Sequence, residues 1–418
     1  MSKKAHLPSD LAQMQALPLE AKEGMSEQRL KVWFGSWTRF EIFNTKTGST
    51  RFKTIDTREV LAEPKLKNTE YIVSAESGAV YVSFSGGKDS TVLADLAAKV
   101  CKRYGYTLYL LFVNTGLEYP EIQKFVKTFA EWLRETYKIE VVLDIVRPEM
   151  RFDEVLKQYG YPVISKGVSN AIRSAKNSIR NKVYSYRLCQ LGVSREEYGG
   201  LFDDGKYNYE EKIEKSKFKR HKWRFLLDAD FESSEECCFI MKKAPAKAYQ
   251  RESGRLPIIA TMACESMERE AAWLKNGCNA FNAKEPKSTP LAFWTNQDIL
   301  HYIKKYKLPY CEVYGDIVFD FQDDTVLNEQ TSFIDYLEEY EATDKLRTTG
   351  CDRTGCIFCM FGCHIEKEPN RFQRLKETHP KQYEYCIGGG EMVNGKWQPN
   401  KKGLGLGKVL NDIGVKYE

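Results

Sequence analysis

The chain has 418 residues, of which 42% are hydrophobic and 29% are charged, so it can bury a core larger than that of one typical domain. Its 63 basic and 58 acidic side chains leave a formal net charge of +5, which by itself is too small to indicate a polyanionic partner. No apolar run comes near the roughly 18 residues that a membrane span requires, and the first residues lack the apolar core of a secretion signal. We therefore expect a cytoplasmic protein that does not enter a membrane.

The order of apolar and polar residues predicts three regions. Residues 1–70 are mixed in pattern and are interpreted as an N-terminal addition. Residues 71–345 alternate between strand and helix patterns, and residues 346–418 form a cysteine-rich segment and tail. The expected elements are strands at 80–84, 107–113, 140–145 and 256–260 and helices from 90 and over 120–137, 266–276 and 296–305. This alternation predicts an α/β fold with a doubly wound parallel sheet that binds its ligand at the carboxyl ends of the strands.

One stretch, residues 166–224, interrupts this alternation. It carries fifteen Lys or Arg against seven Asp or Glu, and aromatic residues such as Tyr186 and Trp223 lie among them. Interleaved cations and aromatic rings suit contacts to a DNA or RNA backbone and its bases. A solvated helical insertion would have the same composition, because runs of charge usually mark exposed faces.

The most informative motif is Ser85-Gly86-Gly87-Lys88-Asp89-Ser90, which lies between an apolar strand and a helical stripe. Adjacent glycines allow a close approach of the backbone to an anion, the serines offer hydroxyl donors, and Lys88 adds a cation. The following helix would direct its N-terminal N–H groups toward the same ligand. The motif therefore predicts a phosphate-binding loop, although the spacing is neither that of a Walker A loop nor that of a dinucleotide fingerprint.

This loop resembles the pyrophosphate-binding PP-loop, Ser-Gly-Gly-x-Asp-Ser, of enzymes that split ATP between its α and β phosphates. The similarity continues toward the phosphoadenosine phosphosulfate (PAPS) reductase family in two further segments. They are Phe112-Val113-Asn114-Thr115-Gly116-Leu117-Glu118 and Pro290-Leu291-Ala292-Phe293-Trp294-Thr295. The resemblance implies an adenine nucleotide alpha hydrolase-like fold, an adenine nucleotide as ligand, and a nucleotide site that includes Thr115 and Gly116. A simple tight turn is the alternative role of the last two residues.

Six of the twelve cysteines are grouped, which in a reducing compartment points to metal binding or catalysis. Cys237 and Cys238, taken with Cys356 and Cys359, are similar to the Cys-Cys and Cys-x-x-Cys halves of iron–sulfur assimilatory reductases. That resemblance implies that these four thiols hold one [4Fe–4S] cluster.

A second ligand set is equally open on spacing. Cys351, Cys356, Cys359 and Cys363 lie within thirteen positions and could close around zinc or a cluster without the Cys237-Cys238 pair. If the first set holds the cluster, Cys351 and Cys363 are left over, with Cys363 as the candidate catalytic thiol, and a neighbouring Arg353 or protonated His364 would lower the pKa of such a thiol.

Departures from the family pattern separate two chemistries. The Gly-Gly-x-Asp core of the loop is intact, Met262 stands where the family has an arginine for the anionic end of its substrate, and the terminal thiol motif is altered around Cys363. These features favour cleavage of ATP to AMP and pyrophosphate, followed by sulfur transfer to an acceptor. In this respect the chain resembles tRNA thiolases and the PP-loop subunit of DNA phosphorothioation systems.

The resemblance then implies roles for individual residues. Lys88 would stabilise the departing pyrophosphate, and Asp89 would assist Mg²⁺ or orient the loop, unless it only pairs with the helix dipole. Glu265 and Arg269 would reach the nucleotide, unless they form a surface ion pair one helical turn apart. A persulfide or a cluster-bound sulfur would then displace AMP, and a partner desulfurase is one candidate donor of the sulfur.

Two other functions remain open from the sequence. The first is a PAPS or adenylyl sulfate reductase that produces sulfite, which the overall family likeness and the Cys-Cys pair favour. The second is a binding module that senses a nucleotide through the loop and holds a partner through a zinc knuckle.

Overall fold

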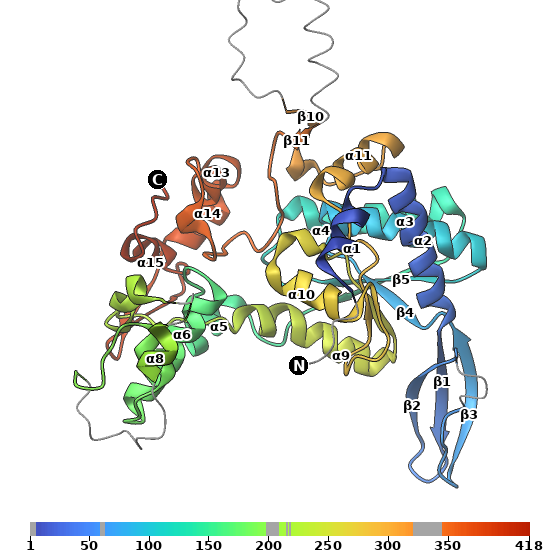
Figure 1. Cartoon of the computed structure of the whole chain (residues 1–418), viewed down its shortest axis with the longest axis horizontal. Helices are drawn as coiled ribbons and strands as arrows, with labels where there is room; N and C mark the ends of the chain where they lie inside the picture. Colours follow the sequence, from blue (N-terminus) through green and yellow to red (C-terminus); the bar gives the residue numbers. More distant parts are fainter. Residues whose placement is uncertain (1–5, 59–62, 198–208, 215, 217–218, 321–344) are drawn as a thin grey trace, which may run out of the picture. The chain divides into compact units, whose positions relative to one another are not determined.

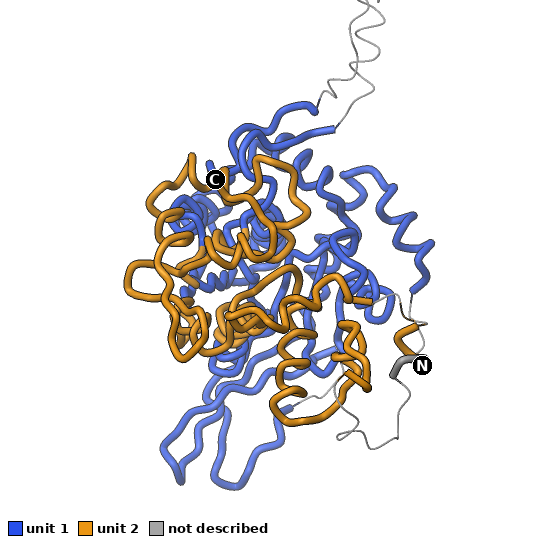
Figure 2. Tube along the Cα trace, turned by 90° about the vertical axis from the view of Figure 1, so that its left-hand side faces the viewer, with its two compact units in different colours: residues 1–114, 118–146, 246–354 blue, residues 115–117, 147–245, 355–418 orange. Residues whose placement is uncertain are grey.

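The computed structural model describes residues 6–58, 63–197, 209–214, 216, 219–320 and 345–418. These residues pack as two units (Figure 2). Unit 1 contains residues 1–114, 118–146 and 246–354, and unit 2 contains residues 115–117, 147–245 and 355–418. No helix in the described part of the chain combines the length and the apolar character that crossing a bilayer would require.

Unit 1 is built on a six-stranded sheet with the order β6-β5-β4-β7-β9-β8 (Figure 1). Its strands are β4 (Val80–Ser83), β5 (Leu108–Val113), β6 (Val141–Val146), β7 (Leu256–Ile258), β8 (Asn279–Ala280) and β9 (Lys287–Ser288). Every neighbouring pair is parallel except β8 and β9. The central strand β4 pairs with β5 on one side and with β7 on the other. The chain crosses from β4 to β5 through α3. This strand order confirms the predicted doubly wound α/β fold.

Helices of unit 1 pack around this sheet. They are α1 (Pro8–Gln15), α2 (Leu19–Gly35), α3 (Lys88–Tyr104), α4 (Pro120–Tyr137), residues 246–253 of α9 (Ala244–Ser253), α10 (Met267–Asn276) and α11 (Asn296–Tyr306), with 3-10 turns at Ala263–Glu265 (η4) and Glu312–Tyr314 (η5). The central helix α3 contacts α2, α4 and α11, and its Val92, Leu93 and Leu96 are fully buried. This helix could be predicted from the sequence because its apolar residues recur at helical spacing. Gly105, in the left-handed conformation, caps its C-terminal end.

A separate antiparallel sheet, also in unit 1, precedes β4 in the chain (Figure 1). Its strands are β1 (Trp37–Asn44), β2 (Ser49–Asp56) and β3 (Glu70–Ser77), in the order β2-β1-β3. Glu76 at the end of β3 pairs with Arg255 (2.9 Å) and with Arg39 of β1 (2.7 Å), which ties the sheet to the loop before β7. Two short strands, β10 (Ile317–Phe319) and β11 (Leu346–Thr348), pair further along the chain.

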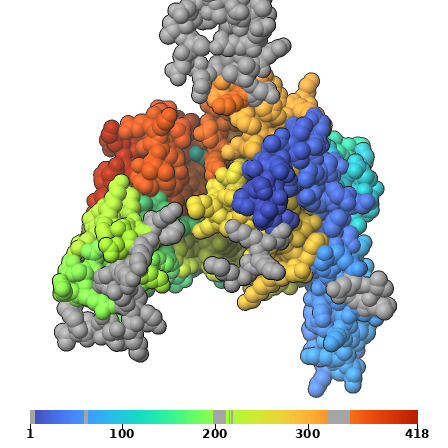
Figure 3. All heavy atoms as spheres, viewed as in Figure 1, coloured from blue at the N-terminus to red at the C-terminus, as the bar shows by residue number. Residues whose placement is uncertain are grey.

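Unit 2 is mainly helical. It contains α5 (Phe152–Tyr159), α6 (Lys166–Arg180), α7 (Tyr186–Gln190), α8 (Tyr209–Glu214), α13 (Arg371–Thr378), α14 (Pro380–Ile387) and α15 (Leu406–Asp412), the hairpin β12 (Glu391–Val393) and β13 (Lys396–Gln398), the 3-10 turns η2 (His221–Leu227) and η6 (Cys363–Ile365), and a π-helical turn at Phe239–Lys243. Within the basic stretch 166–224, the described residues include the helices α6, α7 and α8, the start of η2 and irregular connections, and their side chains form part of the surface shown in light green in Figure 3.

Candidate functional site

The loop 85–90 joins β4 to α3 at the carboxyl end of the central strand, where a doubly wound sheet binds its ligand. Gly86 has φ +73°, and a Cβ atom there would lie 2.9 Å from the Cγ2 atoms of both Ile122 and Val126 in α4. Glycine is therefore required at position 86 for its backbone conformation and for the space that it leaves. Gly87 is the N-cap of α3, so the N–H groups of the first helical turn, which have no acceptor within the helix, begin directly after it.

Hydroxyl groups brace this loop from within. The Ser90 Oγ donates to the Gly87 carbonyl oxygen (2.8 Å) and accepts from the Ser85 N–H (3.2 Å). The Thr91 Oγ1 donates to the same carbonyl oxygen (3.1 Å). These bonds hold the loop in one shape before any ligand binds, which lowers the cost of ordering it.

Charged and polar groups surround the start of α3. Lys88 is buried, and its Nζ lies 3.1 Å from the Asp89 carboxylate. The Lys88 N–H donates to the Tyr314 hydroxyl (3.1 Å), which lies 2.7 Å from the Thr354 Oγ1. No local sequence pattern predicts Tyr314 or Thr354 at this site, because they come from segments more than 220 residues after the loop. A phosphate group at this N–H would meet the Tyr314 hydroxyl as well.

A second charged group lies after β7, the strand beside β4. Glu265 pairs with Arg269 and with Arg353 (3.5 Å), and it accepts from the Met262 N–H (3.1 Å). Burial lowers the pKa of Arg269, and the like charge of Arg353 lowers it further, whereas Asp89 opposes this effect. The electrostatic contact with Asp89 indicates that this group adjoins the loop. Glu265 and Arg269 thus form the ion pair that the sequence allowed as an alternative. Their contact with a nucleotide stays a prediction.

Thr115 and Gly116 follow the end of β5 and belong to unit 2. The Thr115 Oγ1 accepts from the Leu117 N–H (3.1 Å), and Gly116 has φ +73°. The pair therefore forms a tight turn, and its predicted contact with adenosine stays a prediction.

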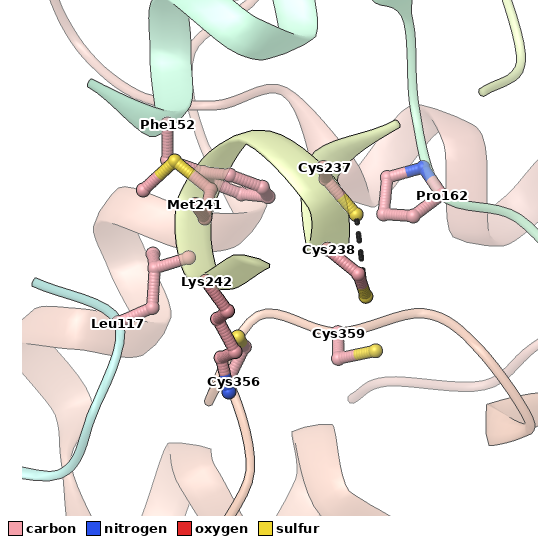
Figure 4. A pocket seen from close by; sticks show the side chains of 9 residues that line it. All are labelled: Leu117, Phe152, Pro162, Cys237, Cys238, Met241, Lys242, Cys356 and Cys359. Carbon is pink, nitrogen blue, oxygen red and sulfur yellow. Dashed lines mark hydrogen bonds between the residues drawn. The ribbon is translucent and has the colours of Figure 1, made fainter. Parts of the chain in front are cut away.

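Four cysteines line one pocket in unit 2 (Figure 4). Cys237 and Cys238 directly precede the π-helical turn, and Cys356 and Cys359 come from the segment that follows unit 1 in the chain. The other residues that line the pocket are Leu117, Phe152, Pro162, Met241 and Lys242. The structure thus brings together the four cysteines that the reductase resemblance implied.

The pocket favours thiolate at one of its cysteines. The Sγ atoms of Cys237 and Cys238 lie 4.0 Å apart. The hydrogen bond from the Cys237 thiol lowers the pKa of Cys238, and the positive charges of Lys166, Lys242 and Lys243 lower it further. Among the described residues, no three His, Cys, Asp or Glu side chains converge closely enough to hold a single metal ion.

The other two cysteines of the rival ligand set lie outside this pocket. Cys351 belongs to unit 1, and its Sγ lies 3.6 Å from the Tyr119 hydroxyl. Cys363 is buried, its Sγ lies 2.9 Å from the Met360 carbonyl oxygen, and burial raises its pKa to about 12 despite the charge of Arg371. This placement does not support a nucleophilic Cys363, because an inaccessible thiol with a raised pKa stays protonated. The predicted activation by protonated His364 is also unsupported, because burial lowers the pKa of that imidazole.

Three comparisons with known proteins give matches. An uncharacterized protein of Methanocaldococcus jannaschii is 38% identical over a short segment of 84 residues, which are 20% of this chain and 18% of that protein. The structure of NMN synthetase from Francisella tularensis matches with a TM-score of 0.22 and 14% identity over 55% of this chain and 62% of that one. Residues 79–173 and 202–361, more than half of the chain, match the phosphoadenosine phosphosulfate reductase domain. The chain therefore belongs to the phosphoadenosine phosphosulfate reductase domain family.

Proposed function

We propose that this chain cleaves ATP to AMP and pyrophosphate and thereby activates an acceptor for sulfur transfer. The observation that carries the proposal is the intact loop 85–90, which is braced by its own hydroxyl groups and leads into the first-turn N–H groups of the buried helix α3. A loop of this kind is complementary to a polyphosphate.

The first chemical step follows from this geometry. An oxygen of the acceptor attacks the α phosphorus of ATP, the bond from that phosphorus to the bridging oxygen breaks, and pyrophosphate leaves with the bonding electrons. The N–H groups after Gly87 and the ammonium of Lys88 stabilise the negative charge that develops on the leaving group. Asp89 offers a carboxylate to Mg²⁺, which when bound would neutralise phosphate charge.

In the second step the terminal sulfur of a persulfide on a partner desulfurase forms a bond to the activated acceptor, and AMP leaves with the acceptor oxygen. A thiol reductant then cleaves the remaining S–S bond, so that the thiolated acceptor is released, the desulfurase thiol is regenerated and the reductant is oxidised to a disulfide. The loop does not have to change between the two steps, because it holds pyrophosphate in the first and is free to release it before the second.

We assign a [4Fe–4S] cluster to Cys237, Cys238, Cys356 and Cys359, with zinc as the alternative. The donor set fits the cluster, because four thiols line one pocket and Lys242 supplies a positive charge beside them. A single zinc ion with Zn–S bonds of about 2.3 Å requires closer convergence than these side chains have. When bound, the cluster would supply iron-ligated sulfur and a site for electron transfer.

Reduction of a sulfonucleotide to sulfite is the second candidate, and the family and the four-cysteine pocket favour it. Met262, at the position of the family's anion-binding arginine, is fully buried and contributes no cation. Because of this difference, we rank ATP cleavage above sulfonucleotide reduction as the proposed function.

The experiment is product analysis with anaerobically purified protein. Radiolabelled ATP with Mg²⁺ should give AMP and pyrophosphate, and single-stranded DNA or RNA should increase the rate. Formation of ADP and phosphate, or no turnover with any of these acceptors, would contradict the proposal. Sulfite formed from PAPS or adenylyl sulfate with a thiol donor would establish the reductase instead.

A further inference from the structure

Two arginines of unit 2 face the first turn of α6. Arg220 directly precedes η2, and its guanidinium fills the space beside Gly167, since a Cβ at Gly167 would lie 2.8 Å from Nη2 and 2.9 Å from Nη1. Arg187 of α7 donates to the Asn170 Oδ1 (3.1 Å) and to the Gln190 Oε1 (2.9 Å). Both hydrogen bonds of Arg187 go to neutral amides, so neither compensates its charge.

These guanidinium groups lack the carboxylates that other arginines of the unit have. In the part of the chain that the structure describes, neither Arg187 nor Arg220 has an acidic partner within 4.0 Å, and the Arg220 Nε is buried without a hydrogen bond. Arg173 and Arg180, on the same helix as Gly167, pair with Glu235 and Glu232. Burial and the like charge of Arg187 lower the pKa of Arg220. Two adjacent cations without a counter-charge reduce stability, and an anionic ligand would remove that penalty.

The helix adds a third positive feature at the same place. α6 is 15 residues long, and its N-cap Ser165 accepts from the Val168 N–H (3.2 Å). The N–H groups of Lys166 and Gly167 belong to the same first turn, where a helix has no internal acceptors. The positive end of the helix dipole therefore coincides with the unpaired arginines, which is unfavourable until an anion binds.

Aromatic side chains with cations on their faces lie in the same segment. The ring of Tyr186 has Arg187 at 5.8 Å and Lys212 at 5.6 Å. Trp223, in the turn that begins after Arg220, has Lys222 at 4.9 Å. Phosphate groups bound by arginine next to rings that can stack on bases are the features of single-strand recognition.

We propose that Arg187, Arg220 and the first turn of α6 bind a phosphodiester group of a single-stranded nucleic acid. The choice of ligand rests on the proposed function and specifies a nucleic acid as the acceptor that it activates. Pro162, which lines the four-cysteine pocket, lies four residues before Lys166 in the chain. A strand held here would therefore lie beside the four-cysteine pocket, within unit 2.

The test measures binding of a fluorescein-labelled 12-nucleotide DNA strand by anisotropy, in the absence of ATP, over a range of salt concentrations. Each phosphate contact to a single strand changes log K by about 0.7 per decade of salt. Arg187→Gln with Arg220→Gln should therefore reduce the salt slope by about 1.4. At 0.1 M salt the double variant should bind roughly 25-fold more weakly than the parent.

Arg180→Gln is the matched control, since it removes the same charge from the far end of α6, about 20 Å from Gly167. Its affinity should stay within twofold of the parent. Because the Arg220 side chain makes no hydrogen bond to any residue that the structure describes, Arg220→Gln should leave the melting temperature equal or higher. A parent that does not bind the strand, an unchanged salt slope in the double variant, or a melting temperature lowered by Arg220→Gln would each overturn the proposal.

Inorganic phosphate distinguishes a strand from a free anion. Phosphate should compete only at concentrations far above those of the strand, and equal affinities would overturn the assignment to nucleic acid. The binding assay contains no ATP, so a strand that does not bind would overturn this site without deciding the proposed reaction. Pyrophosphate release is measured in a separate assay. Conversely, strand binding without ATP cleavage would leave this site standing and remove the proposed reaction.

Discussion

Replacing Gly86 by alanine tests whether the shape of the loop 85–90 determines nucleotide binding. The residue has φ +73°, where an L-residue costs about 1–2 kcal/mol. Its new Cβ would also lie 2.9 Å from methyl groups of Ile122 and Val126, and overpacking of this kind costs about 1–3 kcal/mol. The loop would relieve a strain of about 2–5 kcal/mol by moving away from the conformation that places its N–H groups around a phosphate.

If only 2 kcal/mol of this strain has to be restored on binding, the affinity for ATP falls about 30-fold. Isothermal titration calorimetry with ATP and Mg²⁺ would measure this change. Gly105→Ala is the matched control, because Gly105 at the other end of α3 also has φ +73° but no atom within 4 Å of a new Cβ. It should lower stability by about 1 kcal/mol and leave ATP affinity within twofold. Equal ATP affinity for Gly86→Ala and Gly105→Ala would refute the reasoning.

Three further predictions concern the leaving group, the cysteine pocket and the ion pairs of the N-terminal sheet. Lys88→Met should lower the rate of pyrophosphate release about 10²–10³-fold, measured by an enzyme-coupled pyrophosphate assay, and an unchanged rate would exclude Lys88 from stabilising the leaving group. Cys356→Ser should remove the iron and visible absorbance of anaerobically purified protein, whereas Cys264→Ser, which lies outside the pocket, should retain both; iron kept by the first variant would contradict the assigned ligands. Burial raises the pKa of Glu76, but the hydrogen bond and the charge of Arg255 outweigh burial and hold this pKa below its ordinary value of 4.5. The Glu76 carboxylate therefore stabilises the fold above pH 4.5, and this stabilisation is lost as the pH falls through the lowered pKa. Glu76→Gln should accordingly lower the melting temperature at pH 7 and have a shrinking effect in more acidic buffer, and a pH-independent difference would show that the charge does not contribute.

Elements with strong local patterns could be predicted from the sequence. The helix 120–137 has the bounds expected from its apolar spacing, and α10 and α11 begin after the caps Ser266 and Thr295. The loop 85–90 was also predictable, since all of its groups are contiguous. In these cases the information lies within one helix or one turn, where spacing alone determines which side chains share a face.

Groups assembled from distant segments could not be predicted from such patterns. The Tyr314 hydroxyl meets the Lys88 N–H only because η5 packs near the start of α3, a contact that no local pattern encodes. Spacing alone left two cysteine sets open, and only the fold separates Cys351 and Cys363 from the pocket. Arg187 and Arg220, which pair with no carboxylate among the described residues, could not be told from the other cations of the basic stretch. Composition does not show which cations have carboxylate partners.

A crystal structure with Mg²⁺ and α,β-methylene-ATP, which resists cleavage at the proposed bond, tests the central claim most directly. We predict polyphosphate density against the backbone N–H groups of the loop 85–90 and the first turn of α3, with the Lys88 ammonium beside it. Nucleotide bound elsewhere, with the loop filled by protein side chains, would contradict the account.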